Sequence, residues 1–213
     1  MSILDPEYTY SVSKQQTAAG TADIMSHTFE NYFSNVPSAA LQARFAESIL
    51  KTCIQYAPMA LEDPCNYEAR ANLMWCSSLA INGLLSYGNG VGWCIHPMEH
   101  ELSAFYDITH GVGLAILTPH WMEFALREET VSKFAEYGRN VWGLTGSEKE
   151  VAKEAIECTK KFFRQLNLPA TLTEVGINEQ YFDIMAEKAA NGCEGAFVPL
   201  TKNDIIAIFK AAL

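Results

Sequence analysis

The chain has few basic residues and no long apolar run. Its 213 residues include 15 Lys and Arg against 25 Asp and Glu, a formal net charge of −10. Binding to nucleic acid needs clustered basic side chains, so this charge argues against a nucleic-acid partner. No segment approaches the roughly 20 apolar residues that span a bilayer, and the first residues, MSILDPEYTYSVSK, lack the basic start and apolar run of a secretory signal. We therefore expect no membrane association and a cytoplasmic location.

Paired cysteine motifs are also lacking. The six cysteines are widely spread and form no CxxC pair. Without a secretory signal, and in a chain of this length, we expect free buried thiols in a reducing compartment rather than disulfides. These residues are Cys53, Cys65, Cys76, Cys94, Cys158 and Cys193.

The alternation of apolar and polar residues that marks a β-strand is missing, and helical periodicity runs through nearly the whole chain. The sequence therefore predicts an all-α helical bundle with no βαβ unit. Helices are expected at TADIMSHTFENYF, which SNVP closes, at 38–57, 66–86, 111–126 and 129–142, from Ser147 to about Asn167, at 178–191, and from Thr201 to Leu213.

Capping residues and prolines set the expected helix ends. Ser38 and Asn66 are plausible N-caps, and residues 147–150 form a good capping box. Pro58 and Pro64 bracket an expected break between two helices.

The glycine-rich segment YGNGVGW does not fit a dinucleotide-binding loop. That loop needs GxGxxG after a strand and before a helix. Here Gly88, Gly90 and Gly92 are spaced GxGxG after a helix. We interpret the segment as a turn that lets helices approach one another.

Histidine is scarce but concentrated: three of the five histidines lie in HPMEHELSAFYDITH, residues 96–110. Asp23 and His27 are four residues apart, so on a helix they share one face. His96 and His100 have the same spacing, and Pro97 suits the first helical position, with His96 as the cap.

Two interpretations of these residues stay open on spacing alone. A carboxylate and several neutral imidazoles can bind a divalent transition metal, although each pair taken singly is more often a surface or hydrogen-bonded core pair. The rival is H-x-x-E-H, a zinc peptidase signature in which His96 and His100 bind zinc and Glu99 acts as general base. That interpretation leaves Asp23 and His27 without a role.

The segments TAAGTADIMSHTFENYF and GVGWCIHPMEHELSAFYDITHGVGLAILTPHWM together resemble the iron-containing, or group III, alcohol dehydrogenases, in particular their butanol-dehydrogenase-like members. The resemblance continues through the connector FFRQLNLPATLTEVGI to the ending FVPLTKNDIIAIFKAAL. It implies that residues 1–213 form one helical domain, the metal-binding half of a dehydroquinate-synthase-like fold.

The resemblance also implies a set of site residues. An aspartate and three histidines hold one divalent ion, iron or zinc, in this family. His100 matches a position near the substrate that relays protons, and His120 matches no ligand and is expected to be structural or to face a loop. The implied metal ligands are Asp23, His27, His96 and His110.

The implied activity is NAD(P)-dependent oxidation of an alcohol, or reduction of an aldehyde. The ion polarises the alcohol or aldehyde oxygen, and hydride moves between the carbon that bears it and the nicotinamide. Family members also have an N-terminal nucleotide-binding domain with a GGGS-type loop. No such segment is present in this sequence, so that domain is expected to be absent from this chain and the cofactor-binding residues are unassigned.

Two further questions stay open at this point. The alternative to a catalytic half is a metal-binding or apo helical module that is inactive by itself. The sequence also leaves open whether the chain forms a homo-oligomer.

Overall fold

The computed structural model describes residues 2–36, 38–90 and 92–213, and within these ranges the chain contains α-helices and short 3-10 turns but no strand. The predicted all-α class is therefore confirmed. The helices are α1 (Lys14–Tyr32), α2 (Ala40–Glu62), α3 (Tyr67–Ile81), α4 (Ile95–Tyr106), α5 (His110–Ala125), α6 (Val131–Trp142), α7 (Glu148–Gln165), α8 (Phe182–Ala190) and α9 (Lys202–Ala211), with 3-10 turns η1 (Pro6–Thr9), η2 (Thr173–Val175) and η3 (Glu179–Tyr181).

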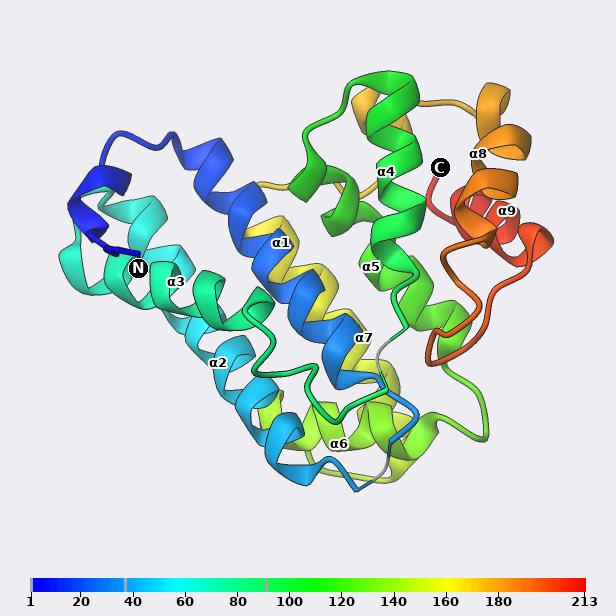
Figure 1. Ribbon diagram of the computed structural model, residues 1–213, viewed down its shortest axis with the longest axis horizontal. Coiled ribbons are helices and arrows are strands. Elements are labelled where there is room, and N and C mark those ends of the chain that lie inside the picture. Colours follow the sequence, from blue (N-terminus) through cyan, green and yellow to red (C-terminus); the bar gives the residue numbers. More distant parts are fainter. Residues whose placement is uncertain (1, 37, 91) are drawn as a thin grey trace.

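Helix α1 runs through the middle of the molecule (Figure 1). It packs against α2 and α3 on one side and against α4 and α5 on the other. Helices α8 and α9 pack together and extend the α4–α5 side, while α6 and α7 form a closely packed pair that contacts α2 and α5. The N-terminus lies beside α3 and the C-terminus beside α9 (Figure 1). Because α1 is central, side chains on its faces can meet residues from helices that are far apart in sequence.

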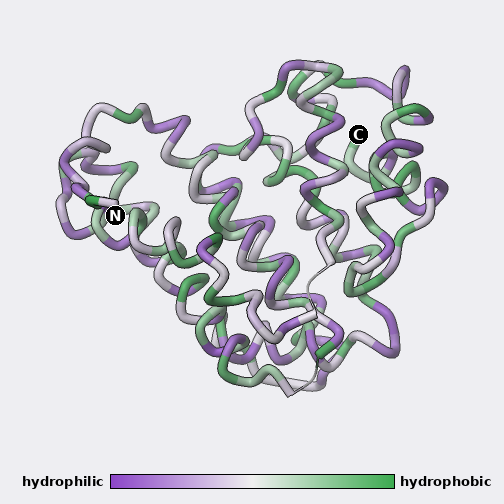
Figure 2. The backbone as a smooth tube through the Cα atoms, viewed as in Figure 1, coloured by the Kyte–Doolittle hydropathy of each residue, from purple (hydrophilic) through white to green (hydrophobic). Residues whose placement is uncertain are grey.

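Most helices are amphipathic, and hydrophobic and hydrophilic residues alternate in short stretches along the chain (Figure 2). Helix α5 differs, because nearly all of its side chains are buried, from Gly111 to Ala125. Its first turn comes close to α1: a Cβ on Gly111 would lie 2.0 Å from the carbonyl oxygen of Ala19. A glycine at this position therefore permits a backbone-to-backbone approach of α1 and α5.

Two of the predicted helix boundaries are confirmed by their caps. The Asn66 side chain accepts a hydrogen bond from the Ala69 N–H at 3.0 Å, and the Ser147–Glu150 capping box is complete. The helix expected at 66–86 ends earlier, at Ile81, because Gly83 adopts a φ of +96°.

Two expectations about α2 are wrong. Ala39, not Ser38, is the N-cap, and no side chain caps this end. The helix also continues through Pro58 to Glu62. Ala57 and Ala60 on either side of this proline are fully buried, so packing of the helix outweighs the one backbone hydrogen bond that proline removes.

The first helix is longer than expected, because α1 begins at Lys14 and Ser13 caps it by accepting from the Gln16 N–H at 3.2 Å. Part of SNVP, the segment expected to close this helix, lies outside the described residues, since it includes Pro37.

All six cysteines are free thiols, as predicted. Four of them are buried, whereas Cys65 is exposed and Cys158 is half-buried.

The glycine-rich segment is a turn, as predicted, but its close contact joins two loops rather than two helices. Gly88 has a φ of +73°, and a Cβ on Gly92 would lie 1.8 Å from the Gly195 carbonyl oxygen. Val91 in the same segment lies outside the described residues.

Among the helices that the structure describes, none combines the length and the apolar character that a membrane crossing requires.

Candidate metal centre

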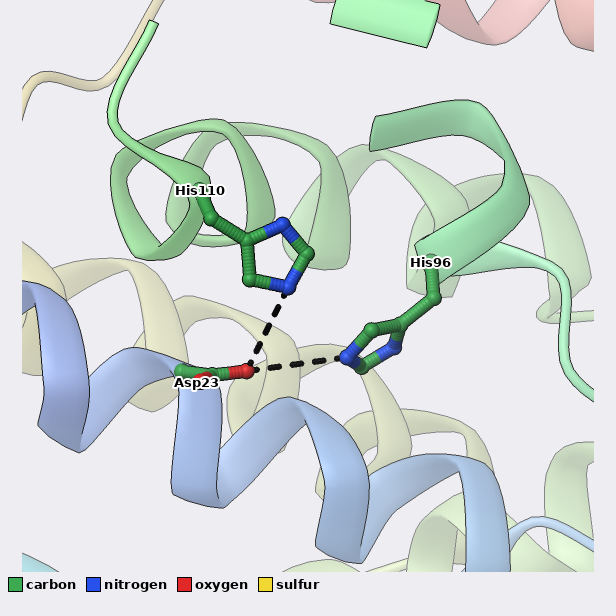
Figure 3. Close-up of side chains that lie close together, drawn as sticks. All are labelled: Asp23, His96 and His110. Carbon is green, nitrogen blue, oxygen red and sulfur yellow. Dashed lines mark ion pairs between the residues drawn. The ribbon is translucent and has the colours of Figure 1, made fainter. Parts of the chain in front are cut away.

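The predicted aspartate and three predicted histidines meet where α1, α4 and α5 come together. One carboxylate oxygen, Oδ1 of Asp23, lies 3.4 Å from Nε2 of His27 and 3.6 Å from Nε2 of both His96 and His110. Figure 3 shows His96 and His110 pointing at Asp23 from two different helices. The geometry thus gathers four side chains that are up to 87 residues apart in sequence around one point.

The polar atoms at this point lack ordinary partners. Asp23 Oδ1 and His96 Nε2 are buried and make no hydrogen bond. Buried polar atoms are normally paired, so two unpaired polar atoms that face each other indicate a ligand between them. The donor atoms of Asp23, His96 and His110 lie within 4.8 Å of one another. This donor set of one carboxylate and imidazoles fits a divalent iron or zinc ion.

His27 lies at the edge of this group. Its ring centroid is 4.3 Å from that of His96, and its Nε2 approaches Asp23 but falls outside the tightest three-residue cluster. Trp93 covers the same two rings, with centroid distances of 4.9 Å to His27 and 4.7 Å to His96. Sequence reasoning gave no role to this half-buried indole.

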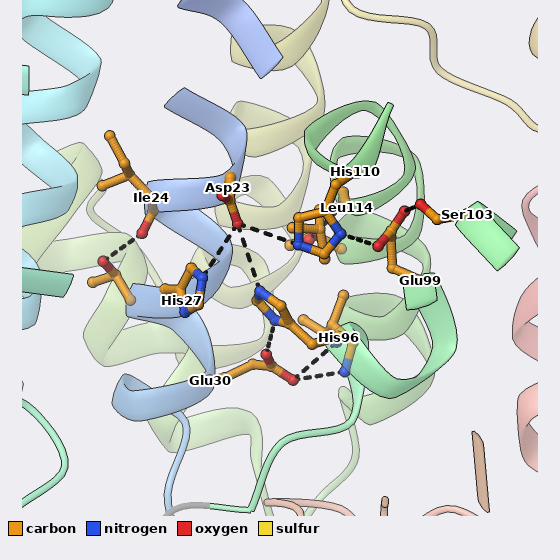
Figure 4. A network of polar contacts seen from close by, with 12 residues as sticks. Asp23, Ile24, His27, Glu30, His96, Glu99, Ser103, His110 and Leu114 are labelled. Atoms are coloured by element: carbon orange, nitrogen blue, oxygen red, sulfur yellow. Dashed lines mark hydrogen bonds and ion pairs between the residues drawn. The ribbon is translucent and has the colours of Figure 1, made fainter. Parts of the chain in front are cut away.

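The other ring nitrogen of His96 contacts a second carboxylate, Glu30, which is 2% exposed (Figure 4). Oε2 of Glu30 pairs with Nδ1 of His96, and Oε1 accepts from the backbone N–H groups of Cys94 and Ile95, each at 2.6 Å. Sequence reasoning missed Glu30. Its position, three residues after His27 and seven after Asp23, places it on the same face of α1 and could have identified it.

This carboxylate explains why the expected start of α4 was wrong. The helix begins at Ile95 with Cys94 as N-cap, so His96 is its second residue and Pro97 its third. Cys94 offers no side-chain cap, because Glu30 from α1 already accepts hydrogen bonds from the first N–H groups. A negative charge at this end also complements the helix dipole.

Glu99 makes the corresponding contact with the other ring nitrogen of His110. It is fully buried, its Oε2 pairs with Nδ1 of His110, and its Oε1 accepts from the Ser103 hydroxyl at 2.6 Å (Figure 4). Both carboxylate oxygens are therefore engaged, so Glu99 is not free to activate a water as the general base of a peptidase.

His100 lies beside this group and is exposed. Its ring stacks on that of His110, with centroids 5.4 Å apart and an angle of 26° between the planes. His120 is elsewhere, 3.6 Å from Glu123 on the same helix, and takes no part in the cluster. The structure therefore separates the five histidines into three at the centre, one beside it and one remote.

Protonation at the centre follows from this crowding. Burial lowers the pKa of His96, but the Asp23 and Glu30 carboxylates outweigh it and raise the pKa to about 9. The contact with Glu99 raises the pKa of His110, whereas burial lowers that of His27. Burial raises the pKa of the Asp23 carboxyl, but the surrounding histidines reverse this and lower it below its ordinary value. A metal ion entering the site therefore competes with protons.

The model of the Fe-containing alcohol dehydrogenase family, C-terminal, matches residues 17–213. The chain belongs to this family. NADH-dependent butanol dehydrogenase A of Clostridium acetobutylicum is 56% identical to it, over 98% of this chain and 55% of the relative. NADPH-dependent aldehyde reductase YqhD of Escherichia coli is 39% identical, over 87% of this chain and 48% of the relative. The family resemblance predicted from the histidine segments is thus confirmed.

Solved structures of the family share the fold. The substrate- and cofactor-free aldehyde reductase YqhD of E. coli matches with a TM-score of 0.91 at 35% identity, over 98% of this chain and 56% of that chain. NADH-dependent butanol dehydrogenase A of Thermotoga maritima matches with a TM-score of 0.90 at 31% identity, over 98% and 55%. The chain therefore has the fold of the helical part of these enzymes and spans about half the length of the relatives it matches.

Proposed function

We propose that this chain supplies the divalent-metal centre of an alcohol dehydrogenase, with Asp23, His27, His96 and His110 as the metal ligands. The observation that carries the proposal is the convergence of three Nε2 atoms on one unpaired oxygen of Asp23, at 3.4–3.6 Å. Membership of the Fe-containing alcohol dehydrogenase family supports it.

The residues of the centre have two roles: some would bind the metal ion, and others orient the metal ligands. An iron or zinc ion bound here would act as a Lewis acid toward an alcohol or aldehyde oxygen. Asp23 contributes one negative charge and the histidines contribute none when neutral, so the site leaves part of the ion's charge uncompensated. Glu30 and Glu99 bind the far ring nitrogens of His96 and His110 and keep both rings directed at the centre.

We assign His100 the role of proton carrier between the substrate hydroxyl and water. Its ring lies against the His110 ring at the centre and is also exposed to solvent, which are the two contacts that this role needs. No other histidine among the described residues combines a stacked contact with a candidate ligand and an exposed ring.

The names of the relatives suggest the substrate and cofactor classes. They describe NADH-dependent butanol dehydrogenases and an NADPH-dependent aldehyde reductase. We therefore propose a small alcohol or aldehyde as substrate and NAD(P) as hydride partner. The nicotinamide would be held by a nucleotide-binding domain outside this chain. A cytoplasmic location stays a prediction.

Metal binding by the purified chain tests the centre directly. After anaerobic incubation with Fe²⁺ or Zn²⁺ and removal of excess metal, we expect one ion per chain by elemental analysis. His110→Ala should reduce metal affinity by more than the roughly 10–100-fold that outer-shell changes cause. His120→Ala is the matched control and should bind like the wild type. A wild-type chain that takes up neither metal would overturn the proposal.

A chimera tests the catalytic part. The metal-loaded chain alone should not oxidise butanol with NAD⁺, whereas the same chain joined to the N-terminal part of the Clostridium acetobutylicum butanol dehydrogenase A should. His100→Ala in the chimera should keep its metal and lose turnover. A chimera that is folded and metal-loaded but inactive would favour the alternative, a metal-binding module without this activity.

A further inference from the structure

We propose that Glu30 and Glu99 are positioning residues that fix the tautomers of His96 and His110, so that each presents an unprotonated Nε2 to the metal. The inference rests on the proposed metal centre and adds two residues to it. It also links the three helices of the site into one ring of contacts.

The first link joins α1 to α4. Glu30 on α1 binds Nδ1 of His96 with one oxygen and the N–H groups of Cys94 and Ile95 with the other. An ionised carboxylate only accepts hydrogen bonds, so in the neutral ring that binds a metal the proton is on Nδ1 and Nε2 keeps its lone pair. The same carboxylate thus orients the ligand ring and anchors the start of the helix that carries it.

The second link joins α4 to α5. Glu99 on α4 binds Nδ1 of His110 at the start of α5, and the Ser103 hydroxyl fixes its other oxygen at 2.6 Å. His110 Nε2 then lies 3.6 Å from Asp23 on α1, which closes the ring. Helices α1 and α4 each carry both a candidate ligand and the carboxylate that orients the ligand of the next helix.

Glutamine substitution separates positioning from simple helix capping. In Glu30→Gln, the amide oxygen can still accept from the N–H groups of Cys94 and Ile95, so the start of α4 keeps its cap. The amide nitrogen, however, donates a hydrogen bond to His96 Nδ1, which moves the ring proton to Nε2 and blocks the atom that the metal needs. Glu99→Gln acts in the same way on His110.

The control is Glu47→Gln. Glu47 is also a buried carboxylate, 7% exposed, and accepts hydrogen bonds from Tyr32 at 3.0 Å and Asn140 at 2.8 Å. Its partners belong to α1 and α6, and neither is a histidine of the centre. Glu47→Gln therefore removes a buried negative charge, as Glu30→Gln and Glu99→Gln do, but changes no residue at the proposed metal centre.

The measurements are Co²⁺ affinity, by competition with a chelator, and the visible absorption spectrum of bound Co²⁺. We expect Glu30→Gln and Glu99→Gln each to lose about 10–100-fold in affinity and to change the spectrum. Glu47→Gln should match the wild type in both. The thermal unfolding midpoint of each metal-free variant shows whether it is folded.

The outcomes distinguish the two proposals. A wild-type chain that binds no Co²⁺ overturns the metal centre itself. A wild type that binds Co²⁺, with both glutamine variants folded and equally tight, overturns the positioning roles while the centre stands. If Glu30→Gln does not fold, Glu99→Gln decides the matter, because Glu99 caps no helix: unchanged affinity there contradicts the inference and a 10–100-fold loss supports it.

Discussion

The α6–α7 pair and the junction of α1, α4 and α5 are both closely packed, but by different kinds of side chain. Between α6 and α7 the buried residues are mainly apolar, such as Val151 and Ala155, and charged residues such as Lys161 and Glu154 stay on the outer face. At the junction the buried residues include Glu30, His96 and Glu99, which are at most 3% exposed.

This difference shows what a binding centre requires of a helical bundle. Burying a charged group costs free energy unless it is paired, and the junction pairs each buried carboxylate with a histidine or with backbone N–H groups. The α6–α7 pair needs no such partners. Changes at the junction should therefore alter metal binding and stability together, whereas changes in the pair should alter stability alone.

The largest loss of stability is expected for Gly111→Ala. The new Cβ would lie 2.0 Å from the backbone carbonyl oxygen of Ala19, which cannot move without shifting α1. We expect a loss of about 3 kcal/mol in the free energy of unfolding and weaker Co²⁺ binding, because His110 moves away from Asp23. Urea unfolding and chelator competition measure the two effects. Unchanged metal affinity in a destabilised variant would break the proposed coupling.

A smaller effect is expected for Gly138→Val in α6. Its Cβ would meet the Val151 side chain at 2.6 Å and separate α6 from α7. We expect about 2 kcal/mol of destabilisation but wild-type metal affinity at a temperature where the variant is folded. Reduced affinity under those conditions would show that the two regions are coupled after all.

The pH dependence of the stability of the metal-free chain should come from residues at the junction of α1, α4 and α5. The folded pKa of His96 is about 9, above the value of about 6.5 for an unfolded histidine. The stabilisation from protonated His96 is therefore complete below about pH 6.5 and is lost as the pH rises to about 9. The unfolding midpoint measured in chelator should fall across this range in the wild type. His96→Gln should show a smaller fall, and equal slopes would contradict the assignment.

The smallest effect is expected for Ser147→Ala at the start of α7. This change removes the capping contact to the Glu150 N–H on an exposed helix end. A lost N-cap costs about 1 kcal/mol, measured by urea unfolding. Metal binding should be unchanged, and any change there would contradict the separation of the two regions.

The sequence predicted what local patterns determine. The capping box and the amphipathic spacing placed α7 almost correctly, because these signals act within one helix. The start of α4 was wrong because Glu30, 64 residues before Cys94, supplies its cap. The continuation through Pro58 also depends on neighbours in space. Glu30 could not be assigned from local signals, since its partner lies on another helix.

The candidate ligands themselves came from the family resemblance, and the structure places all four around one point. Their spacing along the chain left the peptidase interpretation open. The contacts of Glu99, which spacing could not reveal, are what argue against it.

The position of Trp93 gives the centre an optical signal of its own. Its indole lies within 5 Å, between ring centroids, of two histidines that we propose as ligands. An open-shell ion such as Fe²⁺ or Co²⁺ at that distance should quench indole emission strongly, whereas Zn²⁺, with its filled d shell, should quench it far less. The chain has four tryptophans, so the part of the emission that Trp93→Phe removes would then report both whether the site is filled and which kind of metal fills it.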